Sequence, residues 1–359
     1  MTDKIPLKKK IALELYRKYK KNTTKLHKLS YLFWECTLRC NLNCRHCGSD
    51  CKTNPEQKDM AAEDFLKAID QIKPHVNPNE LIIAITGGEP LLRSDLEMVG
   101  KELHNRGFPW GIVTNGYLLS KDRLVSLLKS GLRSITISLD GQKESHNWLR
   151  GNNQSYIKAL NAIGLVSSVK DLVFDVVSCV NQKNIDDLPI LKDLLVNLGV
   201  KNWRLFTISP IGRAKEDDLL HLNPDQFKEL FEYIKTIRKE GEIKASYGCE
   251  GFLGSYESEV RDNFFFCRAG VNIASVLVDG SISACPNLRS NFVQGNIYED
   301  DFMDIWNIKF SEMRNRKWTY KGVCADCNHY KYCNGNGLHL YTEDKELTFC
   351  HLEKLLHSN

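Results

Sequence analysis

Three cysteines near residue 40 have the spacing of a metal-cluster site that leaves one position open. They stand as Cys40-x3-Cys44-x2-Cys47. An iron-sulfur cube has four irons, so three thiolates leave one iron free to bind a reactant, whereas four thiolates restrict the cube to electron transfer. The same difference separates catalytic from structural zinc sites. The spacing therefore predicts a reactive metal-cluster site and not a purely structural one.

The 13 cysteines of the chain are concentrated in two zones. Five lie between Cys36 and Cys51, seven lie between Cys249 and Cys350, and Cys179 stands alone. In a large chain without an export signal, clustered thiols bind metal or do chemistry more often than they form disulfides. The apolar runs are far too short to cross a bilayer. We therefore expect a cytoplasmic protein with no transmembrane segment.

The net charge of +4 is unevenly distributed along the chain. Residues 1–30 carry ten Lys and Arg against two acidic residues, so this segment is +8 and the rest of the chain is −4. Apolar residues recur in the segment at every fourth position: Leu7, Ile11, Leu15 and Tyr19. The pattern predicts a basic amphipathic helix. This helix either packs across the end of the main domain or contacts an acidic peptide, a partner or an anionic membrane, and we expect no nucleic-acid partner.

From residue 31 to about 240, β-rich runs alternate with helical segments six times. The predicted strands are 31–36, 81–86, 110–114, 134–139, 172–179 and 202–208. The predicted helices lie near 59–73, 94–106, 120–130, 155–169, 186–198 and 224–239. This alternation predicts a parallel sheet with right-handed crossovers, as a partial barrel or an open doubly wound sheet. After about residue 245, short strands and spaced cysteines, with one helix near 301–316, predict a second domain.

In both architectures the loops at the carboxyl ends of the strands build the site. Four of these ends carry chemically unusual residues: the cysteine loop, then Gly87 to Pro90, Asn115 with Gly116, and Asp140 with Gly141. We expect the four loops to converge on one face.

On these residues, the chain resembles the radical SAM enzymes that carry a C-terminal SPASM domain. The resemblance implies an α/β fold: a partial (β/α)6 TIM-like barrel over 31–240, and a small cysteine-rich α+β SPASM domain over 245–359, preceded by the basic helical segment 1–30. It implies that Cys40, Cys44 and Cys47 hold a 4Fe-4S cluster whose fourth iron binds S-adenosylmethionine. Cys36 and Cys51 have no place in the family pattern, so we expect neither to be a ligand.

The resemblance also implies residues that bind S-adenosylmethionine. The backbone of Gly87 and Gly88 and the carboxylate of Glu89 would receive the amino group of its methionine part. Paired glycines let a backbone approach a ligand closely, and a carboxylate accepts hydrogen bonds from an ammonium group. Ser138 and Asp140 would face the ribose hydroxyls.

Further candidates are less specific. The segment 211–213 resembles the part of the family that contacts adenine, while structural capping explains Asn115, Asn181 and Arg150 as well as cofactor binding does. The implied reaction is one-electron reductive cleavage of S-adenosylmethionine to methionine and a 5′-deoxyadenosyl radical, which abstracts a hydrogen atom from the substrate. The cofactor carries the difficult step. A flavodoxin or ferredoxin would supply the electron, and no catalytic side chain is assigned.

The later cysteines follow the SPASM pattern. Asp279-Gly280 predicts a two-residue hairpin turn in the run Cys267-x12-Gly280-x4-Cys285. By resemblance, one closed auxiliary 4Fe-4S cluster is held by four cysteines: Cys324, Cys327, Cys333 and Cys350. Cys-x2-Cys pairs suit zinc equally well, so a zinc ribbon is the alternative.

One position departs from the family pattern. The family has a cysteine after Cys333-x3, and this chain has Gly337. The other auxiliary cluster therefore keeps Cys267 and Cys285, with Cys249 as a candidate third ligand. That cluster is three-ligated with an open iron, completed by a non-cysteine group, or absent, which gives one or two auxiliary clusters in all.

The resemblance implies a peptide or protein substrate, because SPASM enzymes mostly modify such chains. Sulfatase maturation is disfavoured, since Pro286 stands where those maturases have an acid. We expect no leader-binding domain before Cys40, so the segment 1–30, the second domain or a separate protein would recognise a leader. The alternatives are tailoring of a small metabolite such as a tetrapyrrole or aminoglycoside, and a non-enzymatic iron-sulfur scaffold.

Overall fold

The computed structural model describes residues 5–248 and 250–357 and contains a ten-stranded sheet in the order β10-β9-β8-β1-β2-β3-β4-β5-β6-β7. Strands β1 to β6 pair in parallel. Their bounds are Tyr31–Glu35, Ile82–Thr86, Trp110–Thr114, Leu132–Ser138, Val173–Val180 and Asn202–Thr207. Each agrees with a predicted strand to within two residues.

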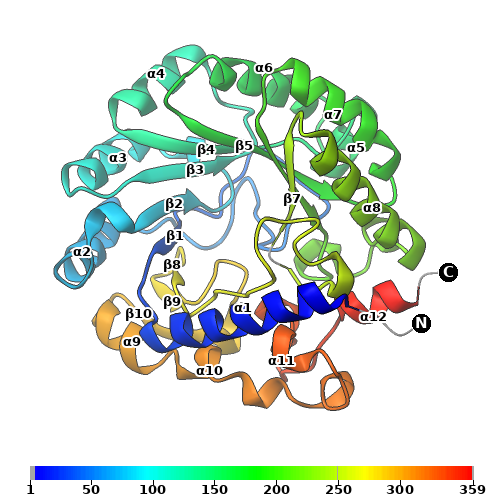
Figure 1. Cartoon of the computed structure of the whole chain (residues 1–359). Helices are drawn as coiled ribbons and strands as arrows, with labels where there is room; N and C mark the ends of the chain where they lie inside the picture. The colour runs from blue at the N-terminus through cyan, green and yellow to red at the C-terminus, as the bar shows by residue number, and fades with distance from the viewer. Residues whose placement is uncertain (1–4, 249, 358–359) are drawn as a thin grey trace.

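Helices cover the outer side of this sheet, which curves into an open barrel (Figure 1). In chain order, α2 to α8 are Ala62–Ile72, Leu96–Asn105, Lys121–Lys129, Lys143–Arg150, Ser155–Ser167, Leu188–Asn197 and Pro224–Glu240. Six of them are the predicted helices. The partial α/β barrel expected from the alternation is therefore confirmed.

Two elements of the barrel were not predicted. Strand β7 (Lys244–Tyr247) pairs in parallel with β6 and adds a seventh parallel strand. Helix α5 lies between β4 and α6 and has few apolar residues to mark it, since only Trp148 and Leu149 interrupt its polar sequence. Gly151 ends α5 in the left-handed conformation at φ 64°.

The C-terminal region continues the same sheet. Strand β8 (Ile273–Val276) pairs in parallel with β1, and β9 (Ser281–Ser283) and β10 (Val293–Asn296) follow it antiparallel. The predicted hairpin is present, with Gly280 at φ 87° in its turn. The division of the chain at residues 31 and 245 stays a prediction.

Short helices complete the C-terminal region. They are α9 Phe302–Ile308, α10 Ser311–Arg314, α11 Tyr330–Cys333 and α12 His351–Leu356. The prediction of one continuous helix over 301–316 was wrong, because α9 and α10 are separate.

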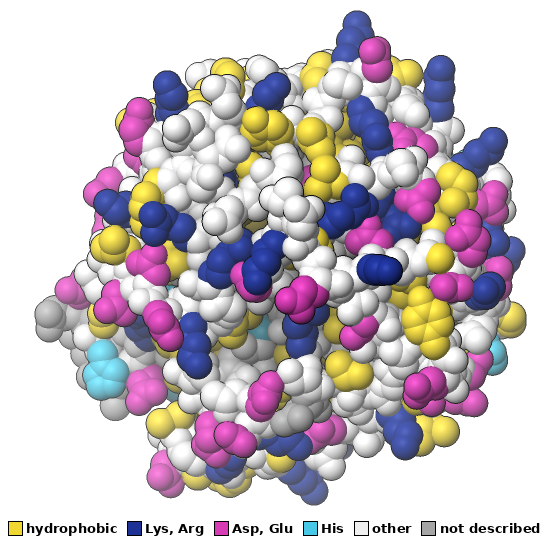
Figure 2. Space-filling model, turned by 180° about the vertical axis from the view of Figure 1, so that it is seen from behind, with side chains coloured by type: hydrophobic (Ala, Val, Ile, Leu, Met, Phe, Trp, Pro, Cys, Tyr) yellow, Lys and Arg dark blue, Asp and Glu magenta, His cyan; other side chains and the backbone are white. Residues whose placement is uncertain are grey.

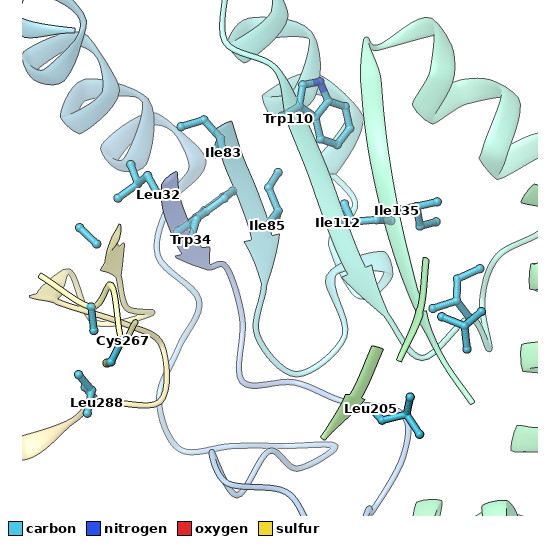
Figure 3. Close-up of a cluster of buried hydrophobic side chains, with 14 of the residues drawn as sticks. Leu32, Trp34, Ile83, Ile85, Trp110, Ile112, Ile135, Leu205, Cys267 and Leu288 are labelled. Carbon is cyan, nitrogen blue, oxygen red and sulfur yellow. The ribbon is translucent and has the colours of Figure 1, made fainter. Parts of the chain in front are cut away.

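One buried cluster of apolar side chains joins the two regions. Trp34 of β1 stacks on Phe65 of α2 with ring centroids 4.2 Å apart. Figure 3 shows Trp34, Cys267 and Leu288 as members of one cluster of buried side chains, and all three belong to the same core. The C-terminal region therefore shares its core with the barrel.

Helix α1 (Leu7–Leu26) crosses the C-terminal region near α11 (Figure 1). The residues it buries are Leu13 and Lys20. The predicted apolar stripe faces outward, with exposures of 75%, 57%, 63% and 56% at Leu7, Ile11, Leu15 and Tyr19. The helix was predicted correctly, and it packs across the end of the fold through a face other than the stripe.

On the opposite face of the molecule, basic and acidic side chains are interspersed and hydrophobic ones are scattered among them (Figure 2). No helix in the described part of the chain is long and apolar enough to span a bilayer.

Two leucines of α1, Leu13 and Leu15, provide a test of this packing. Leu13 is 3% exposed and Leu15 is 63% exposed. We expect Leu13→Ala to lower the free energy of unfolding by about 2–3 kcal/mol, because it leaves a cavity, while Leu15→Ala changes it by less than about 0.5 kcal/mol. Urea denaturation followed by circular dichroism measures both. Equal effects of the two substitutions would contradict the packing described.

Candidate active site

The loop after β1 arranges three thiols around one space. Cys40, Cys44 and Cys47 line a cavity of about 180 Å³. Other predicted residues line the same cavity: Gly87, Gly88, Asn115, Ser138 and Arg150. Three thiols around one space fit a cluster with an open iron, and the neighbouring strand ends leave room beside it for a small ligand.

Two glycines let the loop after β2 lie directly on the cysteine loop. A Cβ on Gly87 would lie 2.2 Å from the carbonyl oxygen of Thr37, and one on Gly88 would lie 2.2 Å from that of Arg39. Gly88 N–H donates to Thr37 O at 2.7 Å instead. Only glycine permits this contact, so the pair is required by the cysteine loop as well as by any ligand.

Glu89 does not line the cavity. Its carboxylate is fully buried and accepts hydrogen bonds from Leu91 N (3.1 Å), Thr114 Oγ1 (2.7 Å) and Asn115 N (2.8 Å). Burial raises the pKa of this carboxyl. The contacts give Glu89 a role in joining the loops after β2 and β3, whereas the sequence predicted an acceptor for the amino group of the cofactor.

The two asparagine candidates differ in position. Asn115 lines the cavity, donates to Asn41 Oδ1 at 2.9 Å and has its Nδ2 4.0 Å from Cys40 Sγ. Asn181 is buried in a turn, where its side-chain Oδ1 accepts a hydrogen bond from Lys183 N–H at 2.9 Å. Structural capping therefore accounts for Asn181.

Asp140 pairs with Arg150 and does not line the cavity. The guanidinium of Arg150 donates from Nε to Asp140 Oδ2 at 2.6 Å and from Nη2 to Oδ1 at 3.0 Å, and its Nη1 lies 4.0 Å from Cys44 Sγ. Burial raises the pKa of Asp140, but the charge of Arg150 and a hydrogen bond with His146 outweigh it and hold that pKa far below its usual value. Asp140 thus fixes a cation beside Cys44.

The segment 211–213 closes over the cysteine loop. Gly212 has φ 56°, and a Cβ there would lie 2.5 Å from Cys47 O. Arg213 donates from Nε to Cys44 O at 2.8 Å and from Nη1 to Cys51 O at 3.0 Å. The sequence analysis proposed that this segment contacts the adenine of the cofactor. The structure shows that it also hydrogen-bonds to the backbone of the cysteine loop.

The two cysteines expected to be non-ligands lie in different surroundings. Cys36 is fully buried at the end of β1, where burial raises the pKa of its thiol. Cys51 lines the cavity, and its N–H donates to Cys47 Sγ at 3.3 Å. A hydrogen bond with the Cys51 thiol lowers the pKa of Cys47 to about 6, which favours the thiolate that a metal ligand requires. The spacing alone gave no sign of this contact.

Four C-terminal cysteines are close enough to affect one another. Burial raises the pKa of Cys324 to about 11, with further contributions from the charges of Cys350 and Cys327, and raises that of Cys333 to about 12, again with a contribution from Cys350. Asn336 N donates to Cys333 Sγ at 3.0 Å. The grouping fits the predicted closed cluster.

No three His, Cys, Asp or Glu side chains within 5–248 and 250–357 are arranged to hold one metal ion. A cubane distributes its thiolates over four separate irons, so its ligands need not meet at one point.

A second cavity, of about 290 Å³, lies between the cysteine loop and the C-terminal region. His46 and Gly48 of the loop line it together with Cys267 and Cys285. Cys249, the candidate third ligand, lies outside the described residues. His46, which the sequence analysis did not single out, lines both cavities, and burial lowers its pKa.

The contact of Gly88 with the cysteine loop provides a test. We expect Gly88→Ala to displace the loop and to remove about four irons per chain from anaerobically reconstituted protein. Gly164→Ala is the matched control, because nothing lies within 4 Å of a Cβ at that position, and it should keep the full iron content. Iron analysis and visible absorbance measure both. Equal iron in the two variants would refute the loop contact.

Comparisons with known proteins agree with this geometry. The chain is 25% identical to the AdoMet-dependent heme synthase of Oleidesulfovibrio alaskensis over 84% of this chain and 81% of that protein. It is 27% identical to the mycofactocin maturase MftC of Mycolicibacterium smegmatis over 85% of this chain and 76% of that protein. The structure of Streptococcus suis SuiB bound to S-adenosylmethionine has the same fold, with a TM-score of 0.70 at 19% identity over 90% of this chain and 76% of that one.

Family models locate the two parts of the chain. The radical SAM superfamily model matches residues 34–195, which contain the cysteine loop and the strand ends around the first cavity. The model of the iron-sulfur cluster-binding SPASM domain matches residues 267–328. The expectation of auxiliary iron-sulfur chemistry in the C-terminal region agrees with this match. The protein is therefore a radical SAM enzyme with a C-terminal SPASM domain.

Proposed function

We propose that this radical SAM enzyme modifies a side chain of a peptide or protein. The size of the second cavity carries the proposal. Pockets for drug-sized ligands measure about 300–1,000 Å³, and this cavity of about 290 Å³ is slightly smaller. Cys267 and Cys285 also line this cavity, so an auxiliary cluster would take part of the space. The remainder would fit one side chain inserted from a longer polypeptide better than a whole tetrapyrrole macrocycle. Two relatives, the mycofactocin maturase MftC and the subtilosin biosynthesis protein AlbA, also support a substrate of this kind.

The residues around the two cavities would have distinct tasks. Cys40, Cys44 and Cys47 would hold the 4Fe-4S cluster, where S-adenosylmethionine supplies the radical that abstracts hydrogen. Arg150 would hold positive charge beside Cys44, at 4.0 Å from its sulfur. His46 lines both cavities and would separate cofactor from substrate.

Modification of a tetrapyrrole is the second candidate function. It is favoured by the heme synthases among the relatives, which match 84% of this chain. These proteins are as similar in sequence as the maturases, at 24–26% identity.

A turnover assay separates the two candidates. Anaerobically reconstituted enzyme is given S-adenosylmethionine, dithionite and either short peptides encoded beside its gene or an iron porphyrin. We expect 5′-deoxyadenosine to increase at least about tenfold with a cognate peptide, because substrate in the cavity is needed for productive hydrogen abstraction. A response to the porphyrin and to none of the peptides would favour the tetrapyrrole candidate and overturn the proposal.

A basic cleft beside α1 supports an acidic electron donor of the flavodoxin or ferredoxin kind. The cleft has a volume of about 670 Å³, and Cys267 and Cys333 are among the residues that line it. Eight basic residues line it as well: Arg17, Lys18, Lys20, Lys21, Arg314, Arg316, Lys317 and Lys331. No acidic residue is among the described lining residues, although Glu14 pairs with Arg17 and Lys331 at its edge. Such a surface steers a negatively charged partner towards it.

Charge reversal tests this docking. We expect Lys18→Glu/Lys21→Glu/Lys317→Glu to lower the rate of reduction by flavodoxin about tenfold or more at low salt, and to leave reduction by dithionite unchanged. Lys8→Glu/Lys10→Glu/Lys25→Glu makes the same change in charge outside the cleft and should retain the rate. Stopped-flow absorbance measures both. Equal losses in the two triple variants would point to net charge and against a docking site in the cleft.

A thiolate-rich site of this kind requires a reducing compartment, so we further propose that the enzyme works in the cytoplasm. A separate leader-binding protein remains part of the proposal for a peptide substrate.

A further inference from the structure

The cavity between the cysteine loop and the C-terminal region contains an imidazole at the place where the family cysteine is missing. His339 lines this cavity together with Cys267 and Cys285. It lies two residues after Gly337, in the short turn Leu338–Leu340. Leu338 and Leu340 are buried at 0% and 1% exposure, so they anchor the turn from both sides of the histidine.

The ring of His339 occupies the space that a side chain at position 337 would need. A Cβ on Gly337 would lie 2.6 Å from Cε1 and 2.9 Å from Nδ1 of His339. It would also lie 2.6 Å from the backbone oxygen of Glu250. Because Gly337 N–H donates to this same oxygen at 3.0 Å, a cysteine cannot enter at 337 without moving backbone. The imidazole of His339 therefore lies where the side chain of a residue at 337 would begin.

The segments that carry these residues are held together by one side chain. Arg316 donates from Nη2 to Cys267 O at 3.2 Å and from Nη1 to Asn336 O at 3.0 Å. It thereby fixes the chain entering the hairpin against the turn that carries His339. Within the described part of the chain, neither ring nitrogen of His339 has a hydrogen-bond partner. By contrast, His221 uses both of its ring nitrogens on backbone carbonyls.

Imidazole is a suitable ligand for iron in such a cluster. Histidine replaces cysteine on one iron of Rieske centres, where the neutral ligand raises the reduction potential. We propose that His339 is the non-cysteine ligand of the auxiliary cluster held by Cys267 and Cys285. This cluster then has a higher reduction potential than one with thiolates only. The proposal rests on the SPASM assignment and is independent of the substrate.

Pulsed electron paramagnetic resonance tests the ligand directly. The protein is used as the variant Cys40→Ala/Cys44→Ala/Cys47→Ala, reconstituted and reduced without S-adenosylmethionine, so that only auxiliary clusters contribute. We expect roughly eight irons per chain and a nitrogen hyperfine coupling on a reduced cluster. Growth on 15N-labelled histidine should convert this coupling from the 14N to the 15N pattern.

Substitutions identify which histidine is responsible. In the same background, His339→Cys should abolish the nitrogen coupling, retain the iron and lower the midpoint potential, because a thiolate replaces the imidazole. His339→Ala should abolish the coupling and release iron from one cluster. His46→Gln is the matched control, since His46 lines the same cavity, and it should keep the coupling.

Two results would overturn the proposal. One is the absence of a histidine nitrogen coupling, with or without a full iron content. The other is a coupling that survives in His339→Cys. Either result leaves the turnover assay with the intact enzyme unaffected, so failure of this ligand and failure of the proposed function are distinguishable.

Discussion

The site depends on direct backbone contact between two loops. Gly88 N–H donates to Thr37 O at 2.7 Å and Glu89 N–H to Arg39 O at 2.9 Å, which places the loop after β2 on the chain just before Cys40. Any side chain on the two glycines would prevent this approach. The buried carboxylate of Glu89 then connects the contact to the loop after β3 through Asn115 N. The walls of the first cavity are therefore fixed by main-chain geometry more than by side-chain packing.

Strand β1 connects this contact to the C-terminal region. It pairs with β2 on one side and with β8 on the other, so the cysteine loop and the hairpin leading to Cys285 begin at neighbouring strands. Trp34 and Cys267 are in one buried cluster. Because side chains in a core are close-packed, the two regions cannot move independently by much. The second cavity, between them, thus has a defined shape.

The sequence predicted correctly those helices and strands that are determined by a local pattern of residues. Six strands and six helices of the barrel were predicted because periodicity and turn residues are local signals. The parallel pairing of β1 with β8 was not predicted, because it joins residues 242 positions apart, such as Tyr31 and Ile273, and no local pattern encodes it. Strand β7 was missed because it has only four residues.

Among the site residues, too, positions at strand ends could be predicted from the sequence, whereas contacts between distant segments could not. The three thiols, both glycines, Asn115 and Ser138 meet at one cavity, as their places at strand ends led us to expect. Neither Cys51 nor His339 could be assigned a contact from sequence, because each depends on how a loop returns towards a distant segment. The spacing after Cys333 shows that this chain lacks a cysteine of the family pattern, but only the fold shows which side chain lies next to Gly337.

Asp140 influences the charge beside the cysteine loop through Arg150. If Cys40, Cys44 and Cys47 bind a cluster as thiolates, their charges would repel one another in the buried loop. A nearby cation would offset this cost only if it is held in place. Arg150 is 7% exposed and would itself be costly to bury unpaired. Asp140 compensates that charge with two hydrogen bonds and leaves Nη1 of the guanidinium directed at Cys44. An acid at the end of β4 is therefore explained by its effect on Arg150, and through Arg150 on the thiolates.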